Sequence, residues 1–270
     1  MTFTVEEDDS NWLSSSSSKR KQRKAYGHKQ HHRPTLSARL QTIQNKLDST
    51  WLNSCTQTLR TCLQDRARTF SANVVGNDSD GYTVTCLGLG SPETSDNARV
   101  QLAFLLTACD ALHINHRNVS IYDPVFTNED KALFVQLGIQ VLEYEHSDSP
   151  PQELHLPLPA AEAQTGVSIL FMPHCDLTLY ESVLAANWSL ERLRNVVFVG
   201  NHFDDYIQNN SVQSLERKAP HLLKIAPNLT AIPLPPSPDW PGAFNNTSVQ
   251  YLTDEKLAAL FKHVDEDKEH

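Results

Sequence analysis

The sequence lacks any apolar run long enough to cross a bilayer. Its first residues, Met1 to Asp9, are acidic and contain no apolar stretch, which predicts that no signal peptide is present. The five cysteines are odd in number and include no CxxC pair, so we expect free thiols that act mostly as small apolar residues. These absences predict a protein of the reducing cytoplasm, the nucleus or both, with no membrane partner.

Positive charge is also scarce. Lys and Arg number 23 against 32 Asp and Glu, which gives a formal net charge of −9. An acidic balance opposes non-specific binding to DNA or RNA, because such binding needs a positive surface. We therefore expect no nucleic-acid partner.

Residues 1–34 contain few large apolar side chains and are predicted to be a disordered tail. An acidic start and a serine run lead to a basic cluster from Lys19 to Lys24. Two interpretations of this cluster stay open, a nuclear-import signal and a solvated charged tail. The tail is also one of two segments that we consider as a surface for a protein partner.

The other such segment is an N-terminal helix, predicted over residues 35–68. Its apolar side chains recur three or four residues apart and trace one stripe: Leu36, Leu40, Ile43, Leu47, Trp51, Cys55, Leu59 and Cys62. This pattern favours a face packed against a core, and the stripe is not basic enough for a membrane surface.

Residues 82–206 alternate between short apolar runs and helical patterns, which is typical of a parallel sheet with helices on both faces. We predict an α/β fold with a Rossmann-like, doubly wound, mainly parallel sheet in the strand order 3-2-1-4-5. The predicted strands are 82–89, 119–123, 139–144, 167–172 and 196–200. A loop is expected over residues 147–166 and a single polar helix over residues 204–218.

The α/β domain as a whole is predicted over residues 35–234, with an added edge strand within residues 225–234. Residues 235–270 are predicted to be a proline-rich linker, a short helix and a charged tail.

Four phrases follow predicted strands: Cys86-Leu87-Gly88-Leu89-Gly90-Ser91, Tyr122-Asp123-Pro124-Val125-Phe126-Thr127, Phe171-Met172-Pro173-His174-Cys175, and Val199-Gly200-Asn201 with Phe203 and Tyr206. In this order and spacing they resemble the SRR-like (sensitivity to red light reduced) family over residues 82–206. The resemblance implies an intracellular regulatory protein. Plant members are linked to light input and circadian rhythm, and others to growth, cytoskeletal or haem-related phenotypes. It implies no accepted catalytic residue, and the family pattern has Ser where this chain has His202.

The same phrases lie at the carboxyl ends of predicted parallel strands, where open α/β sheets bind ligands. A first hypothesis is a nucleotide-like small molecule, such as S-adenosylmethionine or a dinucleotide, bound by six residues: Gly88, Gly90, Ser91, Asp123, His174 and Asn201. The glycines would let the backbone approach the ligand, the next helix would face an anion, and Asp123 would meet a ribose hydroxyl. The alternative is tight packing at the glycines and a turn cap at Asp123, since the third glycine of the usual fingerprint is missing.

A second hypothesis concerns imidazole, thiolate and carboxylate groups at neighbouring strand ends. His174, Cys175, Asp123 and His202 would converge on a zinc or iron ion, or Cys175 at a helix start would have a lowered pKa and act as a nucleophile. The alternative is a purely structural role, with a hydrogen-bonded histidine beside an unreactive thiol. We favour a regulatory protein with a small-molecule site. The main alternative is a methyltransferase-like enzyme that uses the Gly88–Gly90 loop and Asp123, and the other is an interaction scaffold without a ligand.

Overall fold

A computed structural model of the chain describes residues 33–70, 81–143 and 166–266. The chain divides into two units, Met1–Arg33 and Pro34–His270, and every element named below lies in the second. The predicted basic cluster Lys19–Lys24 and nearly all of the predicted loop 147–166 lie outside the described residues.

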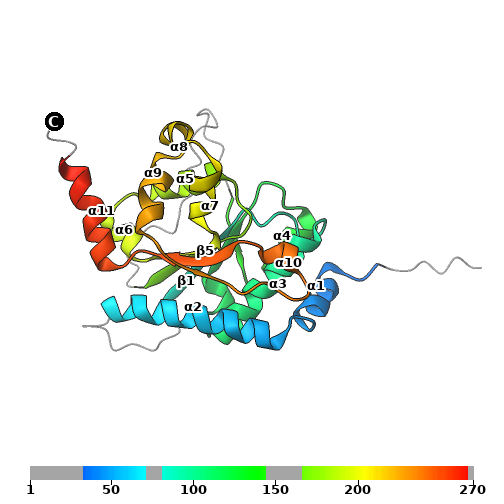
Figure 1. The fold of residues 1–270 in the computed structure, drawn as a ribbon. Helices are drawn as coiled ribbons and strands as arrows, with labels where there is room; N and C mark the ends of the chain where they lie inside the picture. The colour runs from blue at the N-terminus through cyan, green and yellow to red at the C-terminus, as the bar shows by residue number, and fades with distance from the viewer. Residues whose placement is uncertain (1–32, 71–80, 144–165, 267–270) are drawn as a thin grey trace, which may run out of the picture. The chain divides into compact units, whose positions relative to one another are not determined.

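The described residues build one seven-stranded sheet (Figure 1). Its strands are β1 (Tyr82–Leu87), β2 (Val119–Tyr122), β3 (Gln140–Val141), β4 (Val167–Met172), β5 (Val196–Asn201), β6 (Thr230–Pro233) and β7 (Thr247–Tyr251). The order is β3-β2-β1-β4-β5-β7-β6, and the pairs among β1 to β5 are all parallel. The predicted α/β class and the order 3-2-1-4-5 are therefore confirmed.

The far edge of the sheet differs from the prediction. The expected edge strand forms as β6, but it pairs with β7, which lies antiparallel between β5 and β6. No strand was expected within residues 235–270, because Ser248 and Gln250 make β7 look polar. Both side chains are buried, and Gln250 hydrogen-bonds the backbone of Phe203 and Asn201, so their polar groups are satisfied inside the fold.

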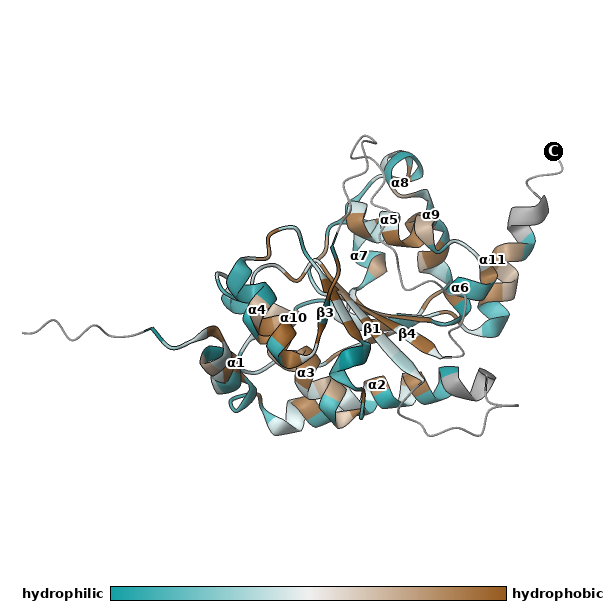
Figure 2. Cartoon of the chain, turned by 180° about the vertical axis from the view of Figure 1, so that it is seen from behind, coloured by the Kyte–Doolittle hydropathy of each residue, from teal (hydrophilic) through white to brown (hydrophobic). Residues whose placement is uncertain are grey.

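Helices cover both faces of the sheet and bury a separate core on each (Figures 1 and 2). One face carries α1 (Leu36–Gln44), α2 (Ser49–Phe70), α3 (Asp96–Ala111), α4 (Asn128–Leu137) and α10 (Pro241–Phe244). The other carries α5 (Leu177–Ala186), α6 (Leu190–Arg194), α7 (Phe203–Asn209), α8 (Val212–Lys218), α9 (Pro220–Ile225) and α11 (Asp254–Glu266). Among the described residues, no helix combines the length and the apolar character needed to cross a membrane.

Two predicted helices are each broken in two. The N-terminal helix splits into α1 and α2, because Asp48 accepts a hydrogen bond from the Trp51 amide and starts a new helix. The helix expected over residues 204–218 splits into α7 and α8 at Ser211, which caps α8 in the same way. The predicted apolar stripe is buried: Trp51 packs on Phe104 and Phe244, and its indole N–H donates to a backbone oxygen.

Candidate functional site

The carboxyl ends of β1, β2, β4 and β5 meet at one rim of the sheet, because these strands are parallel. All six predicted site residues lie on this rim. The structure separates them into two groups, which we call the glycine-loop half and the asparagine half. The glycine-loop half holds Gly88, Gly90, Ser91 and Asp123, and the asparagine half holds His174 and Asn201.

Asp123 closes the glycine loop from inside the protein. Its Oδ2 accepts a hydrogen bond from the Gly90 amide at 2.7 Å, and its Oδ1 accepts one from the Val125 amide at 3.0 Å. Both carboxylate oxygens thus accept hydrogen bonds from backbone amides. The Gly90 amide, which a ligand phosphate would need, already donates to the Asp123 carboxylate. These contacts match the turn-capping alternative for Asp123.

A second carboxylate, which sequence reasoning missed, holds the other end of the same loop. Asp130 on α4 is 0% exposed and accepts hydrogen bonds from Ser91 Oγ and from the Glu93 amide, the latter at 2.8 Å. It also accepts from the amide and hydroxyl of Thr127, which completes a capping box. The Thr-x-x-Asp spacing was the signal for the cap, but nothing in the sequence showed its reach to Ser91.

The first turn of α3 is also capped and charged by the protein's own side chains. Ser95 caps the helix by accepting the Ala98 amide at 3.2 Å. Asp96 pairs with the buried guanidinium of Arg99, whose other N–H groups donate to the backbone oxygens of Pro92 and Glu93. The helix end that was expected to face a ligand anion therefore already has an acidic residue beside it.

The two halves touch where Gly88 meets Cys175. Gly88 has a φ of 66°, and a Cβ built there would lie 2.5 Å from Cys175 Sγ. The thiol is buried and donates to the Leu87 oxygen at 3.3 Å. Burial raises the pKa of Cys175 well above its usual range, and the nearby carboxylates of Asp176 and Asp123 raise it further. The hypothesis of a lowered pKa and a nucleophilic thiolate at Cys175 is wrong.

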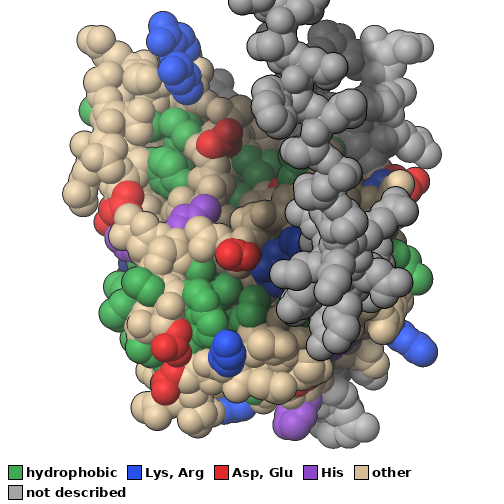
Figure 3. Space-filling model, turned by 90° about the vertical axis from the view of Figure 1, so that its right-hand side faces the viewer, with side chains coloured by type: hydrophobic (Ala, Val, Ile, Leu, Met, Phe, Trp, Pro, Cys, Tyr) green, Lys and Arg blue, Asp and Glu red, His purple; other side chains and the backbone are tan. Residues whose placement is uncertain are grey.

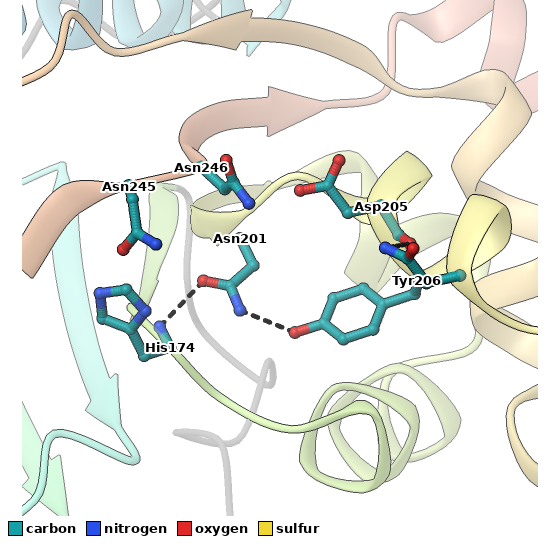
Figure 4. Close-up of a pocket in the computed structure, with 7 residues that line it drawn as sticks. His174, Asn201, Asp205, Tyr206, Asn245 and Asn246 are labelled. Carbon is teal, nitrogen blue, oxygen red and sulfur yellow. Dashed lines mark hydrogen bonds between the residues drawn. The ribbon is translucent and has the colours of Figure 1, made fainter. Parts of the chain in front are cut away.

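In the asparagine half, one side chain joins two strand ends. Asn201 Oδ1 accepts the His174 amide at 2.9 Å, and Asn201 Nδ2 donates to Tyr206 Oη at 2.8 Å (Figure 4). Tyr206 in turn donates to the Cys175 oxygen at 2.6 Å. These contacts hold the backbone of His174 in the left-handed region, at a φ of 57°. The imidazole is fixed too, since Nε2 donates to the Ala243 oxygen at 3.0 Å.

A buried tyrosine supports this arrangement from below. Tyr180 is 0% exposed, donates to the Met172 oxygen and accepts the Asn201 amide at 2.9 Å. Gly200 lies against this hydroxyl so closely that a Cβ has no room. Burial raises the pKa of Tyr206 to about 12, so this phenol is neutral at physiological pH. The residues of this half are therefore preorganised before any ligand arrives.

Above them lies a cavity of about 250 Å³, which we call the polar hollow. Figure 4 shows His174, Asn201 and Tyr206 in one row, with Asn245, Asn246 and Asp205 across from them. The full lining is His174, Asn201, Asp205, Tyr206, Asn209, Asn245 and Asn246. It contains four amide side chains, one carboxylate, one imidazole and one phenol, and it contains neither Lys nor Arg.

The six predicted residues do not share one cavity. His174 and Asn201 line the polar hollow, whereas Asp123 lines a different cavity of about 230 Å³ that runs to Glu143. Gly88, Gly90 and Ser91 line neither. Sequence reasoning missed Asp205, Asn245 and Asn246, and the last two precede the strand that it failed to predict.

The proposed metal centre does not assemble. In the residues that the structure describes, no group of three or more His, Cys, Asp and Glu side chains lies close enough to hold a metal ion. His174, Cys175, Asp123 and His202 are all described, so the hypothesis that they converge on one ion is wrong. The physical reason is that Cys175 is buried against the glycine loop while His174 is exposed above it.

Comparisons with known proteins agree with the resemblance found in the sequence. The family model described as the SRR1 domain matches residues 69–251. A mouse protein named SRR1-like protein is 27% identical over 141 residues, which are 52% of each chain. The Arabidopsis thaliana protein named SENSITIVITY TO RED LIGHT REDUCED 1 is 26% identical over 133 residues, 49% of this chain and 44% of the relative. These matches thus span about half the length of each relative, and no solved structure matches the chain.

Proposed function

The chain belongs to the SRR1 family, and from this membership and the geometry of the rim we propose that it is an intracellular regulatory protein that binds a small molecule in the polar hollow. The relative from Arabidopsis thaliana is named for red-light sensitivity. The role proposed for this chain is a regulatory one, in the cytoplasm or nucleus. Circadian or light-input regulation belongs to this proposal as the family context.

The observation that carries the proposal is the preorganised row of His174, Asn201 and Tyr206. Three hydrogen bonds fix these side chains and the backbone beneath them, while their outer surfaces line an open cavity of about 250 Å³. Fixed polar groups around a concave surface are what small-molecule sites provide. A position that served only packing would gain nothing from holding His174 at a positive φ.

The same geometry argues against the enzyme that was the main alternative. A methyltransferase-like protein would use the Gly88–Gly90 loop, and the Gly90 amide is taken by Asp123. The scaffold alternative predicts no ligand at all, and a binding experiment separates it from the proposal.

The experiment is a thermal-shift screen on the full chain. The panel contains S-adenosylmethionine, adenosine, NAD, ATP and a fragment library of amines, amides, alcohols and carboxylic acids. A ligand that binds only the folded state raises Tm in proportion to the logarithm of its concentration over Kd. We expect at least one member to raise Tm of the wild-type protein.

Asn246→Gly tests whether that ligand lies in the polar hollow. Asn246 has a φ of 60°, so glycine removes the amide without straining the backbone. The matched control is His113→Gly, because His113 is exposed, has a φ of 58° and lies after the carboxyl end of α3, away from the rim. The ligand-induced shift should fall in Asn246→Gly and persist in His113→Gly. A panel with no hit, or a shift that is equal in both variants, overturns the proposal in favour of a scaffold.

A further inference from the structure

A second, larger cavity lies beside the polar hollow. It has a volume of about 460 Å³, and we call it the apolar hollow. Its lining is His202, Asp205, Pro233, Leu234, Pro236, Phe244, Asn245, Asn246, Thr247 and Ser248. Three of these, Asp205, Asn245 and Asn246, also line the polar hollow, so the two cavities share a wall.

The chemistry changes from one hollow to the other. The apolar part of the lining of the apolar hollow consists of Phe244, Leu234 and two prolines, Pro233 and Pro236. The polar hollow offers amides instead. Figure 3 shows hydrophobic side chains in patches on one face of the molecule, with acidic and histidine side chains between them. A ligand that filled both hollows would need an apolar body and a polar head.

The charges around the shared wall determine whether a cationic or an anionic head group is favoured. Neither lining contains Lys or Arg, and the only carboxylate in either is Asp205. No ion pair or side-chain hydrogen bond joins that carboxylate to another described residue, and only its backbone oxygen accepts, from Asn209. An anionic head would meet a negative charge there that has no ion-pair partner within the described part of the chain, whereas a cationic head would pair with it. The net charge of −9 also raises the local concentration of cations.

An independent feature points to a ligand in the apolar hollow. Thr247 is 2% exposed, and its Oγ1 has no hydrogen-bond partner among the described residues. A buried hydroxyl without a partner costs stability, so such groups are uncommon unless something else satisfies them. Thr247 is one of the residues that line the apolar hollow, so this unpartnered hydroxyl is buried within the wall of the cavity.

We propose that the two hollows form one site for a small organic cation with an aromatic or aliphatic body. Its amine lies beside Asp205 and between the amides of Asn245 and Asn246, and its body covers Phe244 and Leu234. This inference rests on the proposed function, because it names the class of molecule for the same site. It disfavours nucleotides with phosphate groups, since neither hollow is lined by a Lys or Arg side chain to hold them.

The test compares two probes with the same ring and similar length. Phenethylamine carries a positive head and 3-phenylpropionate a negative one. Both are titrated into the full ¹⁵N-labelled chain, and each Kd is read from backbone amide shifts. We expect phenethylamine to bind about fivefold more tightly, which is the size of one partly exposed ion pair.

Asp205→Asn removes the proposed counter-charge, and Asp204→Asn is the matched control. The two positions are adjacent, both lie in the first turn of α7, and only Asp205 lines the hollows. The ratio of the two Kd values should approach one in Asp205→Asn and stay near five in Asp204→Asn.

Several outcomes overturn the inference. They are equal or tighter binding of 3-phenylpropionate, a Kd ratio that Asp205→Asn leaves unchanged, and no binding of either probe. None of these outcomes decides whether a ligand site exists, because the proposed function is tested separately by the broad thermal-shift panel and the Asn246→Gly variant.

Discussion

The two halves of the rim use the same kind of strand end in opposite ways. In the glycine-loop half, Asp123 and Asp130 point into the protein and take up the loop amides and the Ser91 hydroxyl. In the asparagine half, Asn201 and Tyr206 satisfy one another and the backbone beneath, and the cavity above them stays open. The half that carries the glycine pattern has its loop closed by the protein's own carboxylates, with a separate cavity beside Asp123, and the half without a known motif holds the polar hollow.

This difference teaches that a glycine-rich turn after a strand is not by itself a phosphate site. Its amides are available to a ligand only if no side chain of the protein reaches them first. Here two carboxylates reach them, Asp123 from the loop between β2 and α4 and Asp130 from the first turn of α4. The glycine-loop half should therefore respond to mutation through stability, and the asparagine half through ligand binding.

The largest expected effect is that of Asp130→Asn. The carboxylate of Asp130 now accepts hydrogen bonds from Ser91, Glu93 and Thr127. The side-chain amide of the variant would place an N–H donor where one of these oxygens accepts, so buried donors would lose their partner. We expect the free energy of unfolding to fall by about 4 kcal/mol. Urea denaturation measures this loss. A change below about 1 kcal/mol would show that the closed half does not depend on this carboxylate.

The next largest effect is at the contact between the halves. Gly88→Ala combines a positive φ with a Cβ 2.5 Å from Cys175 Sγ. Gly138→Ala is the matched control, because Gly138 has a φ of 76° but no atom within 4 Å of a built Cβ. We expect losses of about 3 kcal/mol for Gly88→Ala and about 1 kcal/mol for Gly138→Ala. Equal losses in urea denaturation would mean that the two loops are not in close contact.

A smaller loss is expected at the support of the asparagine half. Tyr180→Phe removes the hydroxyl that joins the Met172 oxygen to the Asn201 amide. We expect unfolding to become easier by about 2 kcal/mol. Tyr251→Phe is the control, since no hydrogen bond of the Tyr251 hydroxyl is found within the described residues and its loss should change stability little. If both variants matched the wild type, Tyr180 would not hold Asn201 in place.

The smallest expected effect is a gain in stability, and it tests the unpartnered hydroxyl of Thr247. Thr247→Val and Thr85→Val each remove a buried Oγ1 that has no partner, so each should stabilise the free protein by about 1 kcal/mol. Only Thr247 lines a hollow. Phenethylamine should bind more weakly to Thr247→Val and equally well to Thr85→Val. Unchanged binding in both would separate Thr247 from the ligand.

The strands that the sequence predicted best are those with continuous apolar runs. The run Val196 to Val199 identified β5 at once, because a strand buried on both faces needs apolar side chains throughout. The same rule hid β7, whose buried Ser248 and Gln250 are satisfied by contacts with residues far away in the chain. Local patterns therefore gave the parallel part of the sheet and the edge strand β6, and missed β7 between them.

The candidate site followed the same division. The rule that ligands bind at strand carboxyl ends placed His174 and Asn201 on the rim, and the structure puts both in the polar hollow. The residues that complete it, Asn245 and Asn246, precede the missed strand. Whether Asp123 faced a ligand or its own loop depended on a hydrogen bond across 33 residues, which no local pattern shows.

The most direct test of the division of the rim is a map of backbone amide shifts in the ¹⁵N-labelled chain on addition of phenethylamine. We predict that the amides of His174, Asn201, Asp205, Asn246 and Thr247 shift, and that those of Gly88, Gly90 and Val125 do not. Shifts confined to Gly88, Gly90 and Val125 would contradict the claim that the glycine-loop half is closed and the asparagine half is the binding site.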